Sequence, residues 1–264
     1  MDFNEKNMAI RLAGKRIGNR IHFLSEVEST NDVLCKLARD GAPHGTVVIA
    51  ECQTKGKGRL NRQWQSPPVC NIYASIALRP AIEPVYAPQI TLMTGVAVAD
   101  VLSIYCPGDV TLKWPNDVQI GGKKVCGILA EMSASARGGV DFVVVGIGIN
   151  VNIRKMDFDE SIRNMATSLA EEAGQNISRL DLTAKLFDRF DDLYTRLLDS
   201  GFGSIKDAWL SYCDMVGKQT RVIFKDDIAS GKVLGLDDFG ALVISYEEGK
   251  IKRVIAGDAS VVKE

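Results

Sequence analysis

One loop of this 264-residue chain combines residue types that suit the binding of an anion. Residues 53–64 hold two glycines, four cations and a tryptophan: Gly56, Gly58, Lys55, Lys57, Arg59, Arg62 and Trp64. Glycine lets the backbone approach a ligand closely, and successive N–H groups in such a turn form an anion nest. A guanidinium suits phosphate or carboxylate, and tryptophan supplies a stacking face. The loop therefore favours an anion site, with a solvated basic loop as the alternative because the Gly-Lys-Ser/Thr pattern of a phosphate loop is missing.

A second candidate stretch is residues 111–131. The Gly121-Gly122 pair separates two runs of alternating apolar residues, which predicts a two-residue hairpin turn. The expected register pairs Ile120 with Lys123, Gln119 with Lys124, and Asp117 with Cys126. Asp117, Gln119, Lys124 and Cys126 would then share one face, with the Cα atoms of Asp117 and Lys124 about 7–8 Å apart. Such a carboxylate and ammonium can flank a small reacting group, and a surface ion pair is the alternative. A slip of one residue would separate them.

Two further stretches carry polar or glycine residues at informative positions. Ser29-Thr30-Asn31 opens a helical pattern, and N-capping uses only one hydroxyl, so the other hydroxyl and Asn31 would face a ligand at the positive helix end. Gly146 and Gly148 alternate along an apolar strand, which leaves one side of that strand without side chains. A packed helix or a planar ligand must therefore approach there. Asn150 would offer its amide to a base edge or to a turn.

The remaining pattern predicts the elements that position these residues. Strands are expected at 46–50 and 71–78, and an apolar helix rich in small residues at 88–105. Residues 182–198 form an amphipathic helical stripe that we interpret as core packing. From residue 216 short strand patterns alternate with turns, which is typical of a small all-β barrel. The sequence thus predicts two domains, residues 1–215 and 216–264.

Composition narrows the class of protein. The net charge of -1 argues against an overall electrostatic grip on nucleic acid. Six scattered cysteines without a CxxC pair suit reduced thiols in a cytoplasmic protein, and two histidines support neither a metal cluster nor a Ser-His-Asp triad. No apolar run is expected to cross a membrane, and the N-terminus lacks the apolar core of a signal peptide.

Several of these stretches, in order along the chain, resemble the biotin protein ligases. They are Ser29-Thr30-Asn31, residues 53–64 (GRGRxGRxW in the family), residues 113–117 (KWPND) and residues 124–131 (KxxGILxE). Residues 146–152 resemble the family's GxGxN strand, and the likeness covers roughly residues 20–264. It implies an α+β fold: a mixed β-sheet with helices packed on one face, as in a class II synthetase-like catalytic domain, plus a small C-terminal SH3-like β-barrel. The loop departs from the family at Lys57, an arginine there, and at Asn61, a glycine there. Asparagine tolerates the left-handed backbone better than most residues.

The resemblance also implies a reaction and a set of site residues. Biotin's carboxylate attacks the α-phosphate of ATP to give biotinyl-5′-AMP and pyrophosphate, and biotin is then transferred to a lysine of a carboxylase's biotin carrier domain. The implied catalytic residues are Arg59, Lys124 and Asp117. The implied biotin-binding residues are Ser29, Thr30, Asn31, Gln53, Gly56, Gly58, Arg59, Lys124 and Gly127. The implied nucleotide-binding residues are Arg59, Arg62, Trp64, Asn116, Lys124 and Asn150. Mg²⁺ accompanies ATP without assigned protein ligands.

The same resemblance bears on partners and on alternative functions. It implies a monofunctional ligase without a DNA-binding domain, no membrane partner, and a homodimer formed through the sheet. A lipoate or octanoate ligase shares the catalytic fold but needs no donors for a ureido ring. A non-catalytic sensor would bind biotin or its adenylate, yet it need not keep Arg59, Asp117 and Lys124 together. A DNA-binding repressor would need a winged helix for which this sequence has no room.

Overall fold

A computed structural model describes residues 2–135, 138–224, 227–247 and 249–262 of the chain. Its largest element is a seven-stranded sheet with the order β1-β2-β3-β7-β6-β5-β4. The strands are β1 (Arg20–Leu24), β2 (Thr46–Ala50), β3 (Ile72–Leu78), β4 (Val110–Lys113), β5 (Asp117–Ile120), β6 (Lys123–Ala134) and β7 (Val140–Ile149). The pair β1 and β2 is parallel and the other pairs are antiparallel, so the sheet is mixed, as predicted.

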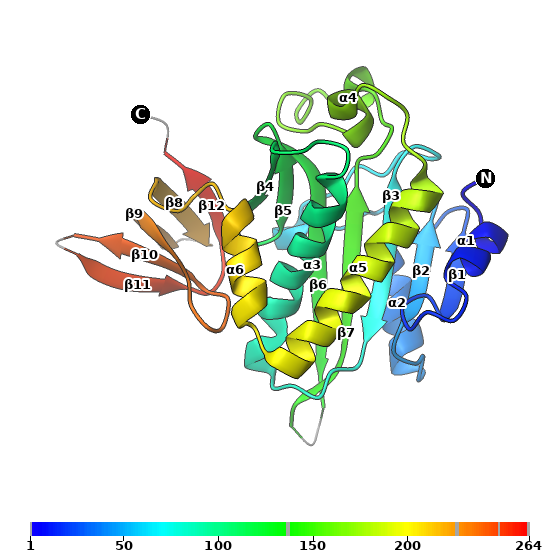
Figure 1. The fold of residues 1–264 in the computed structure, drawn as a ribbon, viewed down its shortest axis with the longest axis horizontal. Coiled ribbons are helices and arrows are strands. Elements are labelled where there is room, and N and C mark those ends of the chain that lie inside the picture. The colour runs from blue at the N-terminus through cyan, green and yellow to red at the C-terminus, as the bar shows by residue number, and fades with distance from the viewer. Residues whose placement is uncertain (1, 136–137, 225–226, 248, 263–264) are drawn as a thin grey trace.

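Most of the helices pack on one face of this sheet. The helices of the structure are α1 (Glu5–Arg11), α2 (Thr30–Arg39), α3 (Ala87–Leu102), α4 (Leu169–Ala173), α5 (Arg179–Ser200) and α6 (Gly203–Tyr212), with short 3₁₀ turns η1 (Arg59–Asn61), η2 (Pro84–Tyr86) and η3 (Lys155–Asp157). α3 and α5 lie side by side across the sheet, with α6 beside α3 (Figure 1). The apolar stripe of α5, which includes Leu186, Phe190 and Leu193, is fully buried in this core. Its role as core packing is confirmed.

The opposite face of the sheet is only partly covered, by α2. Strand residues alternate between the two faces, so Val47 and Ile76 join the core under α3 and α5, whereas Val48 and Ala77 pack with α2 in a separate cluster. The sequence led us to expect helices on one face. The structure has them there and adds α2 on the other, because α2 buries its own apolar stripe against β2, β3 and β7. Beyond α2 this face is left for loops.

The C-terminal part of the described chain forms a second sheet of five strands in the order β11-β10-β9-β8-β12. The strands are β8 (Gln219–Phe224), β9 (Asp227–Leu236), β10 (Leu242–Tyr246), β11 (Lys250–Val254) and β12 (Asp258–Val261), and every pair is antiparallel. This confirms the predicted small all-β unit. It packs beside α6 (Figure 1) through β9. The buried Trp114 indole donates to the carbonyl of Gly240 at 3.0 Å.

The β5–β6 hairpin confirms half of the predicted register and corrects the rest. Ile120 pairs with Lys123 and Gln119 with Lys124, as expected, but a β-bulge follows and Asp117 pairs with Gly127. The expected pairing of Asp117 with Cys126 is wrong because Val125 is an extra residue in β6. As a result Cys126 is fully buried on the opposite face, where burial raises the pKa of its thiol.

One described segment, Pro84–Leu102, is long and apolar enough to cross a membrane, with a mean hydropathy of 1.4. Our expectation from sequence that no run meets this test is therefore too strict. The segment contains α3, the central core helix, and 67% of its apolar window is buried inside the molecule. Its apolar composition is explained by packing on the sheet.

Candidate functional site

The candidate site lies on the sheet face that α3 and α5 leave open. Ser75 of β3, Gly146 and Gly148 of β7 and Gly127 of β6 all point to this face. The N-terminal end of α2 lies against Gly146, and the basic loop lies against Gly148 and Gly127. The site is thus a platform of small residues covered by one helix end and one loop.

The polar residues at the start of α2 come together as predicted. Ser29 is the N-cap residue, but its side chain makes no capping hydrogen bond, so its hydroxyl is not used by the helix. The Thr30 backbone N–H donates to Oε1 of Gln53 at 2.9 Å. Nδ2 of Asn31 donates to a carboxylate oxygen of Glu131 at 2.7 Å. Ser29, Thr30 and Asn31 are each less than 5% exposed, so this is a buried polar cluster of the kind that binds a polar ring.

The prediction of a close approach at the glycine strand is confirmed, and side chains make the approach. A Cβ atom at Gly146 would clash with the Asn31 carboxamide, and one at Gly148 would lie 2.6 Å from Nε1 of Trp64. At Gly127 it would lie 2.9 Å from the same indole ring. Nε1 of Trp64 is buried and has no hydrogen-bond partner among the described residues. The indole therefore lies directly on the glycine platform with its donor unused.

The basic loop folds back on itself as a short hairpin, in which the two glycines form backbone hydrogen bonds with residues at the end of the loop. The N–H of Gly58 donates to the Arg62 carbonyl at 2.7 Å, and the N–H of Trp64 to the Gly56 carbonyl at 2.9 Å. At the tip, Leu60 and Asn61 have φ values of 54° and 59°. Asn61 thus adopts the left-handed backbone that asparagine tolerates better than most residues. The left-handed Leu60 was not predicted, because a leucine in that region costs about 1–2 kcal/mol.

The two lysines of the loop face carboxylates near the start of α2. Nζ of Lys55 lies 2.7 Å from Glu28, and Lys57 pairs with Asp32. The hydrogen bond with Asp32 raises the pKa of Lys57. Exposed ion pairs of this kind contribute little stability. They tether the first half of the loop to α2 without fixing it.

The two arginines of the loop face the C-terminal sheet instead. Nη1 of Arg59 donates to Oδ1 of Asn116 at 3.2 Å and to the Gly257 carbonyl at 3.1 Å, and it lies 3.4 Å from Oδ1 of Asp258. Nη2 of Arg62 lies 2.5 Å from the other oxygen of Asp258. Burial lowers the pKa of Arg59 while the nearby carboxylates oppose this, and the guanidinium stays charged. A residue from β12 thus holds the second half of the loop.

Asp117 and Lys124 meet on the open face, as the hairpin predicts. Their side chains lie 2.6 Å apart and form an ion pair, so in the structure they neutralise each other rather than flank a separate group. Nζ of Lys124 also lies 5.4 Å from the centroid of the Trp64 ring, within range of a cation–π interaction. An incoming anion would find the ammonium already beside the stacking face.

The two predicted asparagines are used by the protein itself. Nδ2 of Asn116 donates to the Ile128 carbonyl at 2.9 Å while its oxygen accepts from Arg59. Asn150 is 4% exposed, and its side-chain amide donates to the Thr167 carbonyl at 3.1 Å. Asn116 therefore orients a loop arginine. Asn150 holds the segment that precedes α4.

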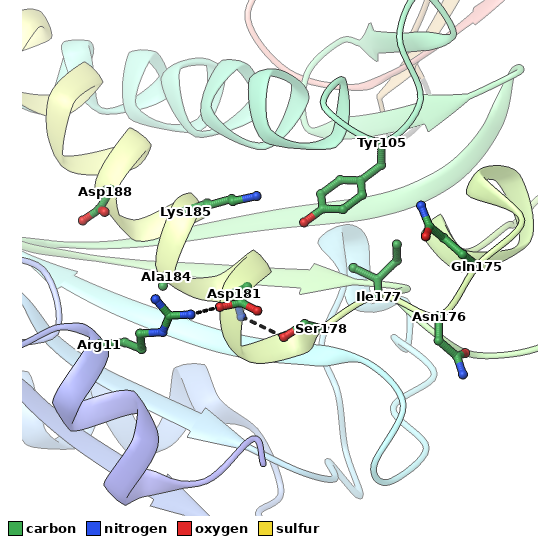
Figure 2. A pocket seen from close by; sticks show the side chains of 10 residues that line it. All are labelled: Arg11, Tyr105, Gln175, Asn176, Ile177, Ser178, Asp181, Ala184, Lys185 and Asp188. Carbon is green, nitrogen blue, oxygen red and sulfur yellow. Dashed lines mark hydrogen bonds and ion pairs between the residues drawn. The ribbon is translucent and has the colours of Figure 1, made fainter. Parts of the chain in front are cut away.

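A cavity of about 420 Å³ lies elsewhere, on the helical side of the molecule (Figure 2). Its lining includes Arg11, Tyr105, Asp181 and Lys185. Arg11 and Asp181 pair with each other across it, and the Lys185 ammonium lies 5.4 Å from the Tyr105 ring centroid. None of the predicted site residues lines it, so we place the chemistry on the open face.

Sequence reasoning missed three side chains of the site. The hydroxyl of Ser75 is hydrogen-bonded to the side chains of Thr30 and Asn31 in the buried cluster. Oγ of Ser66 lies 3.0 Å from Nε2 of Gln53. Asp258 forms ion pairs with both loop arginines. Ser75 sits in an alternating strand, where a small polar residue on the open face is the only available signal. Asp258 is far from the loop in sequence, and only the fold brings it near.

Comparison with known proteins shows to which family this chain belongs. The model of the biotin/lipoate A/B protein ligase family matches residues 24–150, and that of the biotin protein ligase C-terminal domain matches residues 216–262. The chain is 36% identical over 255 residues to the bifunctional ligase/repressor BirA of Bacillus spizizenii, a match that spans 97% of this chain and 78% of that protein. This chain belongs to the biotin protein ligase family.

Two further relatives support the same assignment for the ligase. The biotin–[acetyl-CoA-carboxylase] ligase of Paracoccus denitrificans is 33% identical over 233 residues, covering 86% of this chain and 95% of that one. The structure of a biotin protein ligase from Aquifex aeolicus in complex with biotin and ATP is 32% identical, with a TM-score of 0.80 over 93% of this chain and all of that one. The fold and the sequence therefore agree over nearly the whole ligase.

Proposed function

We propose that this biotin protein ligase joins biotin to ATP on the open face of its large sheet, with Arg59, Lys124 and Asp117 as its catalytic residues. The biotin carboxylate attacks the α-phosphate, the bond to the β-phosphate oxygen breaks, and pyrophosphate leaves with the electron pair. Two anions must meet and charge grows on phosphate oxygens, so fixed cations lower the barrier. The support is the position of the Lys124 ammonium, which faces the site beside the Asp117 carboxylate and the Trp64 ring.

The biotin end of the substrate is proposed to lie against the buried polar cluster at the start of α2. Ser29, Thr30, Asn31 and Gln53 offer hydroxyl and amide groups there. The remaining proposed biotin contacts are the backbone and side chains of Gly56, Gly58, Arg59, Lys124 and Gly127. The free hydroxyl of Ser29 and the small residues of the platform support this orientation.

The nucleotide end is proposed to lie toward the basic loop and β5. Arg59 and Arg62 would bind phosphate oxygens after releasing Asp258, and Trp64 would stack near the adenine. The remaining proposed nucleotide contacts are Lys124, Asn116 and Asn150. The hydrogen bonds that Asn116 and Asn150 make within the protein favour a positioning role for both, since one N–H of each amide already donates to a backbone carbonyl.

In the second half-reaction the amine of a carrier lysine attacks the mixed anhydride and AMP leaves. The attacking amine must first lose a proton, and Asp117 is the carboxylate beside Lys124 that can accept it. The proposed acceptor is the carrier domain of a biotin-dependent carboxylase, as the name of the Paracoccus relative suggests. The loop would close over the labile adenylate and exclude water until the carrier arrives.

Four further expectations stay proposals. Mg²⁺ would accompany ATP and neutralise its phosphates, although no group of three His, Cys, Asp or Glu side chains that could hold a metal occurs in the described part of the chain. We also propose a cytoplasmic location, a homodimer formed through the sheet, and a domain boundary between residues 215 and 216. Light scattering of the purified ligase tests the homodimer.

The function is tested by biotin-dependent exchange of labelled pyrophosphate into ATP without any carrier. Exchange that requires biotin and is not supported by lipoate is the expected result, followed by transfer of biotin to a carrier domain when one is added. Binding of biotin without exchange would favour a non-catalytic sensor. Exchange supported by lipoate alone would refute the proposed substrate.

A further inference from the structure

Glu131 lies one layer behind the proposed biotin contacts, on the open face of β6. A carboxylate oxygen of Glu131 accepts from Nδ2 of Asn31 at 2.7 Å, and the Leu129 carbonyl accepts from the same nitrogen at 3.2 Å. Both neighbours are obligatory acceptors, so the amide nitrogen of Asn31 must face them. The orientation of this amide is therefore fixed, and its oxygen faces Ser75.

This orientation fixes the hydroxyl hydrogens next to it. Oγ of Ser75 lies 2.7 Å from Oδ1 of Asn31, which has no hydrogen to give, so Ser75 donates its only hydroxyl hydrogen there. Ser75 then has none left for Oγ1 of Thr30, 2.8 Å away. Only Thr30 can supply a hydrogen to that contact. Ser75 is fully buried and Thr30 is 4% exposed, so exchange of hydrogen bonds with bulk water does not change which hydroxyl donates.

The other side of Thr30 is fixed by the backbone. Its N–H donates to Oε1 of Gln53 at 2.9 Å, so Nε2 of Gln53 faces Ser66, 3.0 Å away, and Ser66 donates to the Trp64 carbonyl at 3.1 Å. Oε1 of Gln53, 3.1 Å from Oγ1 of Thr30, is the only other described contact of that hydroxyl, and it is an acceptor too. In either case the Thr30 hydrogen points into the protein and its lone pairs receive no hydrogen from a described neighbour.

We propose that Glu131, acting through Asn31 and Ser75, makes the Thr30 hydroxyl a hydrogen-bond acceptor toward the ligand and so selects a ring that presents an N–H. This rests on the proposed placement of biotin against Thr30 and Gln53. A cyclic urea supplies such N–H groups, and its carbonyl can accept from the second hydrogen of Nε2 of Gln53. A dithiolane ring supplies neither. Glu131, Asn31 and Ser75 are thus positioning residues for urea recognition.

The test compares Glu131→Leu, Glu131→Gln and Ser75→Ala in steady-state pyrophosphate exchange, with KM measured separately for biotin and for ATP. Glu131→Leu and Ser75→Ala should raise KM for biotin about tenfold or more, since an unpaired buried polar group is costly. KM for ATP and kcat should change less than threefold. Glu131→Gln keeps an amide oxygen that can accept from Asn31, so it should restore KM for biotin to within about threefold of the original protein.

Further measurements separate recognition from folding. Asp100→Leu removes the acceptor for Arg189 and Tyr212 on the opposite side of the sheet, so it should lower the melting temperature and leave KM for biotin unchanged. Desthiobiotin, which keeps the urea and lacks the thioether ring, should lose as much affinity as biotin in the Glu131→Leu and Ser75→Ala proteins.

An unchanged KM for biotin in either variant would overturn the proposal. So would an equal rise in KM for ATP, or failure of Glu131→Gln to restore biotin affinity. If the unmodified protein does not bind biotin at all, the proposed function fails first.

Discussion

At the scale of single residues, Lys124 has the contacts expected of a cation that binds an anionic ligand. Its ammonium is shared between the Asp117 carboxylate and the face of Trp64, and it is 33% exposed. A lysine with a purely structural role would need only one carboxylate partner at the surface. The neighbouring Lys123 is of that kind, because at the start of β6 it pairs with Glu172 of α4.

Replacement of Lys124 by alanine should therefore affect chemistry far more than folding. We expect adenylate formation to fall about 10²–10³-fold, as when one group that stabilises transition-state charge is removed. Lys123→Ala is the matched control and should retain adenylate formation within about twofold. The measurement is biotin-dependent pyrophosphate exchange together with a melting curve. Parallel losses of activity and melting temperature in Lys124→Ala would assign it a structural role.

His44 gives the fold a dependence on pH that is independent of the site. Burial and the nearby Arg16 lower its pKa, and its Nδ1 accepts from the Arg79 backbone N–H at 3.3 Å, which requires the neutral ring. The unfolded chain therefore binds a proton at higher pH than the folded one. Stability is fully present above the ordinary histidine pKa of about 6.5 and is lost as pH falls from there through the lowered folded value.

Denaturant titrations between pH 7.5 and pH 5.5 check this dependence. The free energy of unfolding should fall over that range in the original protein and fall less in His44→Gln. The chain has one other histidine, the exposed His22, so His22→Gln should keep the original slope. Equal slopes in all three proteins would contradict the assignment to His44.

Residue types predicted much of the site, and long-range contacts account for what was missed. Arg59 and Lys124 were proposed because their types suit anion binding, and Thr30 because of its place at a helix start and the family resemblance. The structure has Thr30 and Lys124 on the open face, whereas Arg59 is directed toward Asn116 and the C-terminal sheet. Ser75 and Asp258 could not be found in this way. Each reaches the site through strands that are distant in sequence, and a serine in a strand or an aspartate in a turn has many ordinary uses.

At the scale of elements, the glycines of β6 and β7 determine where the Trp64 indole rests. Gly148 leaves no room for a side chain, since a Cβ there would lie 2.6 Å from Nε1 of Trp64. Both strands are hydrogen-bonded on both sides within the sheet, so their backbone cannot retreat. The indole must therefore move if a substitution adds a Cβ atom at one of these glycines.

Gly148→Ala should therefore displace Trp64 and lower exchange activity more than tenfold, with a loss of stability of about 1–3 kcal/mol from overpacking. Gly203 at the start of α6 has open space around its Cβ position and an ordinary backbone. Gly203→Ala should retain full activity and gain about 0.4–1 kcal/mol of stability. Full activity in Gly148→Ala would show that the position of the indole is unimportant.

The β5–β6 hairpin shows how far alternation alone can predict an element. The Gly-Gly turn fixed the first two residue pairs correctly, and Asp117 and Lys124 came together as expected. The bulge at Val125 was missed because Val125 and Cys126 are both apolar, and both are fully buried on the same side. A run of two buried residues has no pattern that reveals which of them is extra.

At the scale of the whole molecule, Asp258 joins the C-terminal sheet to the basic loop. It pairs with Arg59 and Arg62, and the Gly257 carbonyl beside it accepts a further bond from Arg59. These contacts use the same guanidinium groups that the proposed chemistry offers to phosphate. The C-terminal sheet therefore holds the loop in place when no nucleotide competes for it.

Loss of this tie should expose the loop. Asp258→Ala should increase the rate of tryptic cleavage within residues 53–64 several-fold in the absence of ligands, since local opening controls proteolysis. Biotin with ATP should restore most of the protection. Asp238→Ala removes a highly exposed acid in the turn between β9 and β10, where it pairs with Lys206, and it should not alter cleavage. An unchanged cleavage rate in Asp258→Ala would show that other contacts hold the loop.

The fold as a whole was predicted in outline from sequence, because long apolar periodicities and the family resemblance both report on packing. The mixed sheet, the core helices and the separate all-β unit are all present. The placement of α2 on the open face was not predicted. An amphipathic stripe such as that of Leu34 and Ala38 says that a helix is covered on one side but not which face of a sheet covers it.

The position of Trp64 has a consequence for optical work on this enzyme. The chain contains three tryptophans, and Trp114 and Trp209 are each only 2% exposed within the core. Trp64 alone lies on the site, with a cation close to its ring and an indole N–H that no described residue accepts. Its emission is therefore a built-in reporter, and stopped-flow fluorescence can time ligand arrival without any attached dye.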